Sequence, residues 1–158
     1  MATAEQHQAA LDRVFELVVL MADDMTHSLG RQGLTTSRAH LLWELRSGPT
    51  TQQSLATAMN VSARNITGLV DGLVAAGFVS RQPHPTDRRA TLVTFTELGE
   101  STTEAMQRDQ KHLAAQLFSG LPEGRFNCLF DGLGEVLTRL HLAIAEQDQA
   151  AVPAAGRR

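Results

Sequence analysis

The chain has 158 residues, enough for one compact domain with an appended helical element. A hydrophobic content of 42% and a charged content of 20% are typical of a globular protein and exclude a solvated disordered chain. The formal net charge of −3 counts mildly against a nucleic-acid binder, and the single cysteine excludes an internal disulfide. No stretch approaches the roughly 20 apolar residues of a membrane span, and the N-terminus lacks a signal-peptide pattern, so we expect a soluble cytoplasmic protein.

The N-terminal part of the chain predicts two helices, because apolar residues recur at steps of three and four. The first is expected to begin at Thr3, which stands at capping-box spacing from Gln6, and to end within residues 30–33. The second is expected over residues 37–46, before the stop signal Ser47-Gly48-Pro49.

Two short helices joined by a tight turn are expected next. Thr50 and Gln53 have the spacing of a capping box for the first of them. Asn60 tolerates the conformation that a turn requires. Ser62 is a favourable N-cap for the second helix, which is expected to close at residues 75–77.

The pattern then changes from a helical to a strand period. Residues 78–81 and 91–95 predict two short strands of a hairpin, and the proline-containing, charged stretch 82–90 predicts the loop between them. Thr96 is expected to cap a long helix that reaches about Phe118.

A last helix is expected after Pro122, with its end at about Gln147. Its apolar residues follow a 4-3-4-3-4 spacing, which is typical of a helix-packing seam. Both terminal regions are therefore amphipathic helices that can pack on each other and on a second copy of the chain. The seam residues are Phe126, Phe130, Leu133, Leu137, Leu140 and Ile144.

The segment over residues 51–95 carries the functional hypothesis. The turn at residues 59–62 matches the spacing of a helix-turn-helix, in which the second helix enters the major groove of DNA. Arg64 and Asn65 stand in the first turn of that helix, away from its apolar face. Arg can pair bidentately with guanine and Asn with adenine, so these two side chains are suited to read base edges.

Two glycines lie on the exposed face of the same helix, although each costs about 1 kcal/mol relative to alanine in a helix. Gly68 and Gly72 could allow the helix backbone to approach DNA closely, or could relieve crowding against another helix. The sequence leaves both explanations open.

Charge is distributed unevenly along the chain. Residues 61–95 hold four arginines and two aspartates, a net charge of +2, which leaves −5 for the rest. Arg88 and Arg89 at the hairpin tip could reach a narrow minor groove, whose negative potential attracts arginine. Asp87 fits a structural role better, a charge-assisted bond that holds an arginine side chain. A merely solvated charge run is the alternative, and the position after a helix-turn-helix favours the functional interpretation.

As a set, these motifs resemble the MarR family of bacterial transcription regulators, although no single motif is specific. The resemblance in element order covers nearly the whole chain, and the motif match covers about residues 50–100. The matching positions are Gln53-Ser54-Leu55-Ala56, Val61-Ser62, Ile66-Thr67, Leu69-Val70-Asp71, Leu73, Gly77-Phe78-Val79, Arg81, Asp87-Arg88-Arg89 and Thr96-Glu97-Leu98-Gly99.

The resemblance implies a mainly α fold with a small β-hairpin wing, a winged helix-turn-helix joined to an intertwined helical dimerisation domain. Residues 1–34 and 96–147 would form the dimerisation domain, 35–95 the DNA-binding domain and 148–158 a flexible tail. The partners implied are a second copy of the chain and a palindromic double-stranded DNA operator, and the expected outcome is repression.

The resemblance also implies a set of contacts to DNA, in which Arg88 inserts into the minor groove. Many family members carry Arg or another polar residue at the positions of Gly68 and Gly72, so this chain lacks two of the family's usual contacts. The residues expected at the DNA are Ser62, Arg64, Asn65, Thr67 and Gly68 on the recognition helix, Arg81, Asp87, Arg88 and Arg89 on the wing, and Thr51 and Gln52 at the DNA backbone.

Many family members release DNA when a small aromatic compound binds between the two domains. Met25, His27, Leu29, His40 and Trp43 fall near the place where that cleft would form. The alternative for such a stripe of Met and Trp is plain core packing.

Other chemistry has little support in the sequence. Cys128 could sense oxidants, as cysteines do in some relatives, but a buried structural thiol is favoured. The six histidines show no ligand spacing, and no nucleophile elbow, phosphate loop or paired-Cys motif is present, so we expect no metal, no cofactor and no enzyme activity. Two alternatives stay open: a regulator that responds to no ligand, and a helical protein-interaction module that does not bind DNA.

Overall fold

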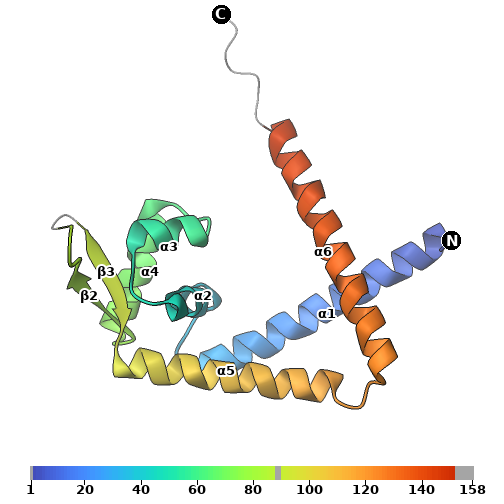
Figure 1. The fold of residues 1–158 in the computed structure, drawn as a ribbon, viewed down its shortest axis with the longest axis horizontal. Coiled ribbons are helices and arrows are strands. Elements are labelled where there is room, and N and C mark those ends of the chain that lie inside the picture. Colours follow the sequence, from blue (N-terminus) through green and yellow to red (C-terminus); the bar gives the residue numbers. More distant parts are fainter. Residues whose placement is uncertain (1, 88–89, 152–158) are drawn as a thin grey trace, which may run out of the picture. The chain divides into compact units, whose positions relative to one another are not determined.

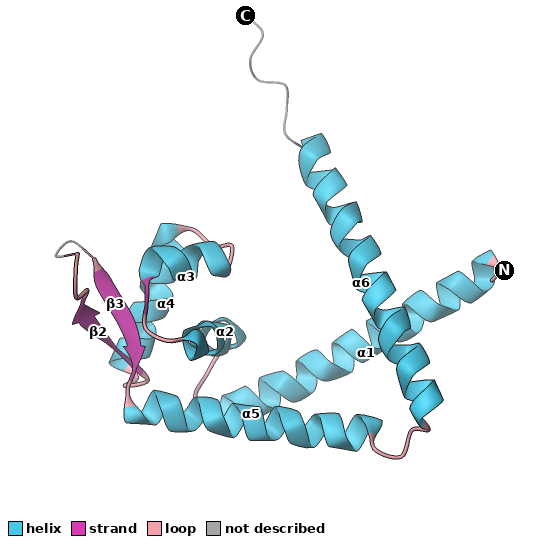
Figure 2. Ribbon diagram, in the orientation of Figure 1, coloured by secondary structure: helices cyan, strands magenta, loops and turns pink. Residues whose placement is uncertain are grey.

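The computed structural model describes residues 2–87 and 90–151 and divides into two compact units, residues 1–108 and 109–158 (Figure 1). The described elements are helices with one small three-stranded antiparallel sheet, so the predicted fold class is confirmed (Figure 2). No helix within the described ranges has both the length and the apolar character needed to cross a membrane.

Helix α1 (Ala4–Arg31) begins with the predicted capping box. Thr3 Oγ1 accepts a hydrogen bond from the Gln6 backbone N–H (3.3 Å), and Gln6 Oε1 accepts one from the Thr3 backbone N–H (2.8 Å). The chain leaves the helix through Gly33, whose φ of 69° lies in the left-handed region. The start and the end of this helix are therefore those that the sequence predicts.

Helix α2 (Thr36–Glu44) is followed by one 3₁₀ turn, η1 (Leu45–Ser47). The regular helix is thus shorter than the predicted 37–46, because its last turn tightens. Gly48, with a φ of 115°, then redirects the chain.

A two-residue strand, β1 (Thr50–Thr51), precedes helix α3 (Gln52–Ala58) and was not predicted. The sequence predicted Thr50 as the N-cap of α3, and this prediction is wrong. The cap is Thr51, whose Oγ1 accepts from the Ser54 backbone N–H (3.1 Å). The first threonine is instead held in the sheet, and a pairing of two residues leaves no periodic signal in a sequence.

Helix α4 (Ala63–Ala75) follows a tight turn that Asn60 makes possible with a φ of 51°. Its N-cap is Ser62, as predicted, and the Ser62 hydroxyl accepts from the Asn65 backbone N–H (3.2 Å). Gly77, with a φ of 80°, ends the helix and turns the chain into the sheet.

The sheet has the strand order β1-β3-β2, with β2 (Val79–Pro83) and β3 (Thr91–Phe95) forming the predicted hairpin. Strand β2 extends two residues beyond the predicted end. Val93 of the central strand pairs with Arg81 on one side and with Thr50 on the other. The hairpin is therefore anchored through β1 to the start of α3.

Helix α5 (Glu97–Phe118) is attached to the sheet at its first turn. Thr96 caps it by accepting from the Gly99 backbone N–H (3.1 Å), and the same hydroxyl donates to the Gly77 carbonyl (2.5 Å). A Cβ on Gly99 would lie 1.9 Å from the Phe78 carbonyl oxygen, so only glycine fits here.

The buried core of the first unit lies between the end of α1 and the central strand. Helices α2, α3 and α4 enclose it together with the sheet. Its residues are Leu29, Leu34, Ala39, Leu41, Leu42, Leu45, Leu55, Ile66, Val70, Leu73, Phe78, Val79 and Val93.

The second unit contains helix α6 (Glu123–Ala151). The helix continues four residues past the expected end at Gln147, because Gln and Ala are good helix formers. The expected tail 148–158 thus begins in a helix, and residues 152–158 lie outside the described residues. Cys128 is exposed, so its predicted burial is wrong for the single chain, because α6 has no core of its own to pack on.

Candidate nucleic-acid interface

The first turn of α4 presents a polar, exposed surface. Arg64 and Asn65 are both exposed, Arg64 on the side of the helix opposite its buried residues and Asn65 on its flank. A Cβ on Gly68 would have no atom within 4 Å, so the helix surface one turn later is open. Two side chains that can read bases therefore stand beside a stretch of accessible helix backbone.

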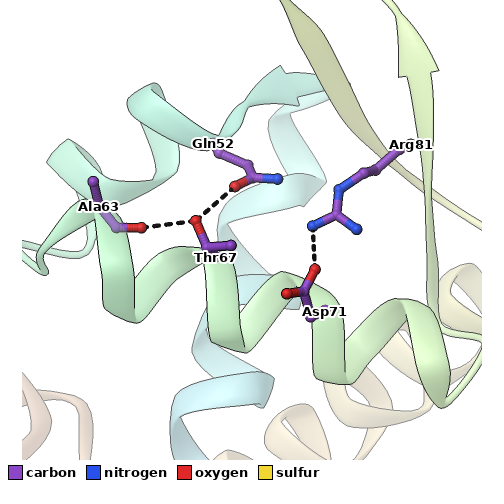
Figure 3. Close-up of polar contacts among 5 residues, drawn as sticks. All are labelled: Gln52, Ala63, Thr67, Asp71 and Arg81. Atoms are coloured by element: carbon purple, nitrogen blue, oxygen red, sulfur yellow. Dashed lines mark hydrogen bonds and ion pairs between the residues drawn. The ribbon is translucent and has the colours of Figure 1, made fainter.

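A polar network joins α4 to α3 and to strand β2 (Figure 3). Arg81 Nη2 lies 2.6 Å from Asp71 Oδ1, and Gln52 lies 3.2 Å from the Thr67 hydroxyl. The Thr67 hydroxyl also donates to the Ala63 carbonyl oxygen (2.8 Å). These contacts fix the recognition helix relative to its two neighbouring elements.

The orientation of the Gln52 amide follows from the number of protons available. The Thr67 hydroxyl has one proton, which it donates within its own helix, so Gln52 must donate to Thr67. With the amide nitrogen turned to Thr67, the amide oxygen accepts from Arg81 Nε and Nη2, both at 3.1 Å. Gln52 then connects the helix-turn-helix with the wing.

Arg81, which was predicted to contact DNA from the wing, is engaged within the protein. Its side chain is 33% exposed and bonds to an Asp71 side chain that is 60% exposed. Part of the guanidinium remains accessible, so a DNA contact stays a prediction. Its evident role is to hold β2 against α4.

Two surface hollows lie along this face. One, of about 630 Å³, lies between α3 and α4, and the other, of about 540 Å³, lies between the start of α3 and the base of the wing. Gln52 and Gln53 line both, so the two hollows meet at the start of α3. Thr51 and Gln52, the residues predicted at the DNA backbone, line the second hollow.

The described part of the wing loop is organised around His84, which the sequence did not single out. Its Nδ1 accepts hydrogen bonds from the backbone N–H groups of Thr86 (3.3 Å) and Asp87 (3.1 Å). Arg88 and Arg89 lie outside the described residues, so their predicted DNA contacts stay predictions. Local bonds of this kind are ordinarily made by Asn, Asp, Ser and Thr, so no pattern in the sequence marks His84 for this role.

The structure separates the two glycines of α4. A Cβ on Gly72 would lie 2.3 Å from Nη2 of Arg38, so this glycine relieves crowding against a neighbouring helix. Gly68 has no such neighbour. Crowding therefore explains Gly72 and not Gly68, for which a close approach to DNA stays a prediction.

The five residues predicted to line an effector pocket have different surroundings. Leu29 is buried in the core, whereas Met25 is exposed. His27 bonds to a carbonyl of its own helix, and His40 lies 3.3 Å from a carboxylate one turn away. Trp43 is half-buried beneath the Arg46 guanidinium, 4.2 Å from the ring centroid. The pocket stays a prediction.

The profile of the MarR family matches residues 34–91, which hold the helix-turn-helix and the first part of the wing. The chain carries a MarR-family domain. The resemblance found in the sequence motifs is thereby confirmed.

Similar proteins include two HTH-type transcriptional repressors. The HTH-type transcriptional repressor YetL of Bacillus subtilis is 32% identical over 94 residues, 58% of this chain and 56% of YetL. The repressor IacR of Pseudomonas putida is 30% identical over 103 residues, 65% of this chain and 62% of IacR. The alignments thus span less than two thirds of these relatives' length. The family and its named relatives are transcription regulators and not enzymes, as the sequence predicted.

Solved MarR-family structures share the fold over most of the chain. The structure of Streptococcus pneumoniae FabT in complex with DNA has a TM-score of 0.74 at 16% identity, covering 88% of this chain and 98% of FabT. Wild-type MarR from E. coli, in its apo form, has a TM-score of 0.63 at 27% identity, covering 80% of this chain and 96% of MarR.

Proposed function

We propose that this protein is a transcription regulator that binds a palindromic operator as a homodimer and represses transcription. The observation that carries the proposal is the first turn of α4, where exposed Arg64 and Asn65 follow a capped start and adjoin open helix backbone. Arg and Asn form the bidentate pairs that distinguish guanine and adenine in a major groove. A role on DNA is also the reason to expect the protein in the cytoplasm.

The support for a homodimer is the apolar surface of the terminal helices. Phe15 on α1 is 59% exposed and Phe130 on α6 is 67% exposed, and both belong to long apolar stripes. A monomer rarely exposes contiguous apolar surface of this extent. The seam spacing on α6 fits a helical partner, and a second copy of the chain supplies the same stripe to it. The exposed seam members are Phe126, Phe130, Leu133, Leu137, Leu140 and Ile144.

Twofold symmetry gives the operator its form. Two copies related by a twofold axis present two α4 helices, which reach successive major grooves about 34 Å apart. Such a dimer matches a palindrome, with the wings over the flanking minor grooves. The printed names of the relatives YetL and IacR, both called repressors, support repression as the outcome.

We include release by a small aromatic effector in the proposal. The support is Trp43 on α2, whose ring carries the Arg46 guanidinium over one face and which is only half-buried, so that an aromatic surface remains partly accessible. Thermal-shift measurements with a panel of phenolic compounds test it. A regulator of the same fold that responds to no ligand shows no shift with any of them.

DNA binding is tested by fluorescence anisotropy with the duplex upstream of the protein's own coding sequence. Arg64→Ala is expected to lose about 1–3 kcal/mol of preference for that duplex over one of mixed sequence. Equal loss on both duplexes would remove the base-reading role of Arg64. A dimer that binds neither duplex at low salt would instead be a helical interaction module.

A further inference from the structure

We propose that Arg38 on α2 contacts a DNA phosphate and that Gly72 on α4 provides the seat that holds its guanidinium in place. The proposal rests on the proposed function, because the ligand is the sugar-phosphate backbone of the same duplex. In this proposal Arg38 supplies a positive charge beside a part of the recognition helix that has no cation of its own.

The seat is visible in the contacts at Gly72. A Cβ at this position would lie 2.3 Å from Arg38 Nη2, 3.0 Å from Cζ and 3.1 Å from Nε. The guanidinium therefore lies against the backbone of α4, in space that any side chain at position 72 would occupy. A Cβ built on Gly68, one turn earlier, would have no atom within 4 Å.

Arg38 is half-buried, yet its guanidinium has no acceptor among the described residues. Other arginines of this unit are engaged: Arg81 pairs with Asp71, and Arg46 stacks on an indole ring. A partly desolvated cation without an acceptor is unfavourable, and an anion that reaches it gains a charge-assisted bond. Phosphate suits the planar donor fork of arginine.

The position along α4 fits a phosphate rather than a base. Gly72 lies two helical turns after Asn65, a rise of about 10 Å, and the major groove is about 12 Å wide. When the first turn of α4 meets base edges, the seat lies near the rim of the groove, where the backbone runs. Within α4 the Asp71 carboxylate is already paired with Arg81, and Arg64 lies about two turns before Gly72. Arg38 therefore supplies the positive charge without an acceptor at this end of α4.

The test is anisotropy with a labelled duplex of three helical turns and mixed sequence, titrated at several salt concentrations. Arg38→Gln keeps a polar stem and removes the charge. Each lost phosphate contact is expected to weaken binding about eightfold at 0.1 M salt and to reduce the slope of log K against log salt by about 0.9. Arg108→Gln removes the same charge from α5, where the side chain is 68% exposed, and is expected to change neither quantity.

A second variant separates the seat from the charge. Gly72→Ala adds a methyl group that displaces the guanidinium, while alanine raises the melting temperature as the better helix former. We expect a more stable protein that binds DNA more weakly, and no further weakening when Gly72→Ala is added to Arg38→Gln. If Gly72→Ala weakened DNA binding equally in the wild-type and the Arg38→Gln proteins, Gly72 would not act by holding the Arg38 guanidinium.

The failures of the two proposals are distinguishable. A wild-type protein that binds while Arg38→Gln retains its affinity and salt slope overturns the role of Arg38 alone. A wild-type protein that binds no duplex overturns the proposed function, and the role of Arg38 with it.

Discussion

Gly99→Ala is expected to destabilise the protein, although alanine is the better helix former. The added Cβ would lie 1.9 Å from the Phe78 carbonyl oxygen, whereas ordinary contact begins at 3.4 Å, so α5 and the sheet must separate by about 1.5 Å. That shift strains the bond of 3.1 Å that the Thr96 backbone N–H donates to the same carbonyl. Overpacking costs about 1–3 kcal/mol, and each hydrogen bond about 1 kcal/mol. After a gain of about 1 kcal/mol in helix propensity, we expect a net loss of about 2 kcal/mol.

The assay is urea unfolding followed by circular dichroism, at one protomer concentration because the stability of a dimer depends on it. The matched control is Gly68→Ala, another glycine in a helix, where a Cβ meets no atom within 4 Å. The control is expected to gain about 0.5–1 kcal/mol. A Gly99→Ala protein as stable as the control would refute the reasoning from close approach.

Three further predictions concern the wing and the apolar seam. A double-mutant cycle with Asp71→Ala, Arg81→Ala and the double variant should give a coupling free energy of about 0.5–1 kcal/mol, because the ion pair is partly exposed. Additive losses of stability would contradict the role of this ion pair in holding β2 against α4. His84→Asn, whose Oδ1 can replace Nδ1 as acceptor, should retain DNA affinity, whereas His84→Ala should weaken it severalfold; equal affinities in anisotropy would exclude a role for the loop bonds. Phe130→Glu should convert the dimer to a monomer in light scattering, and an unchanged mass would place the dimer interface elsewhere.

The elements with strong local signals were predictable. Thr3 and Ser62 cap their helices, Asn60 and Gly77 take positive φ, and the hairpin strands pair as expected because each of these depends on neighbouring residues. Strand β1 was missed for the converse reason. Two residues acquire strand geometry only from pairing with β3, about forty positions later in the chain.

The candidate interface divides in the same way. Exposure of Arg64 and Asn65 follows from helical periodicity alone, so the sequence predicts it. The engagement of Arg81 by Asp71 and the loop bonds to His84 depend on distances between elements or on loop geometry, which periodicity does not contain.

The sequence by itself determined the helices, the hairpin and the MarR-type order of elements, since caps, breakers and apolar periods act over a few residues. Only the tertiary structure decided why α4 holds two glycines. Gly68 leaves the helix surface open, and Gly72 receives a guanidinium from α2. A glycine has no side chain that could record its neighbour, so the reason for each becomes visible only when the helices are packed together.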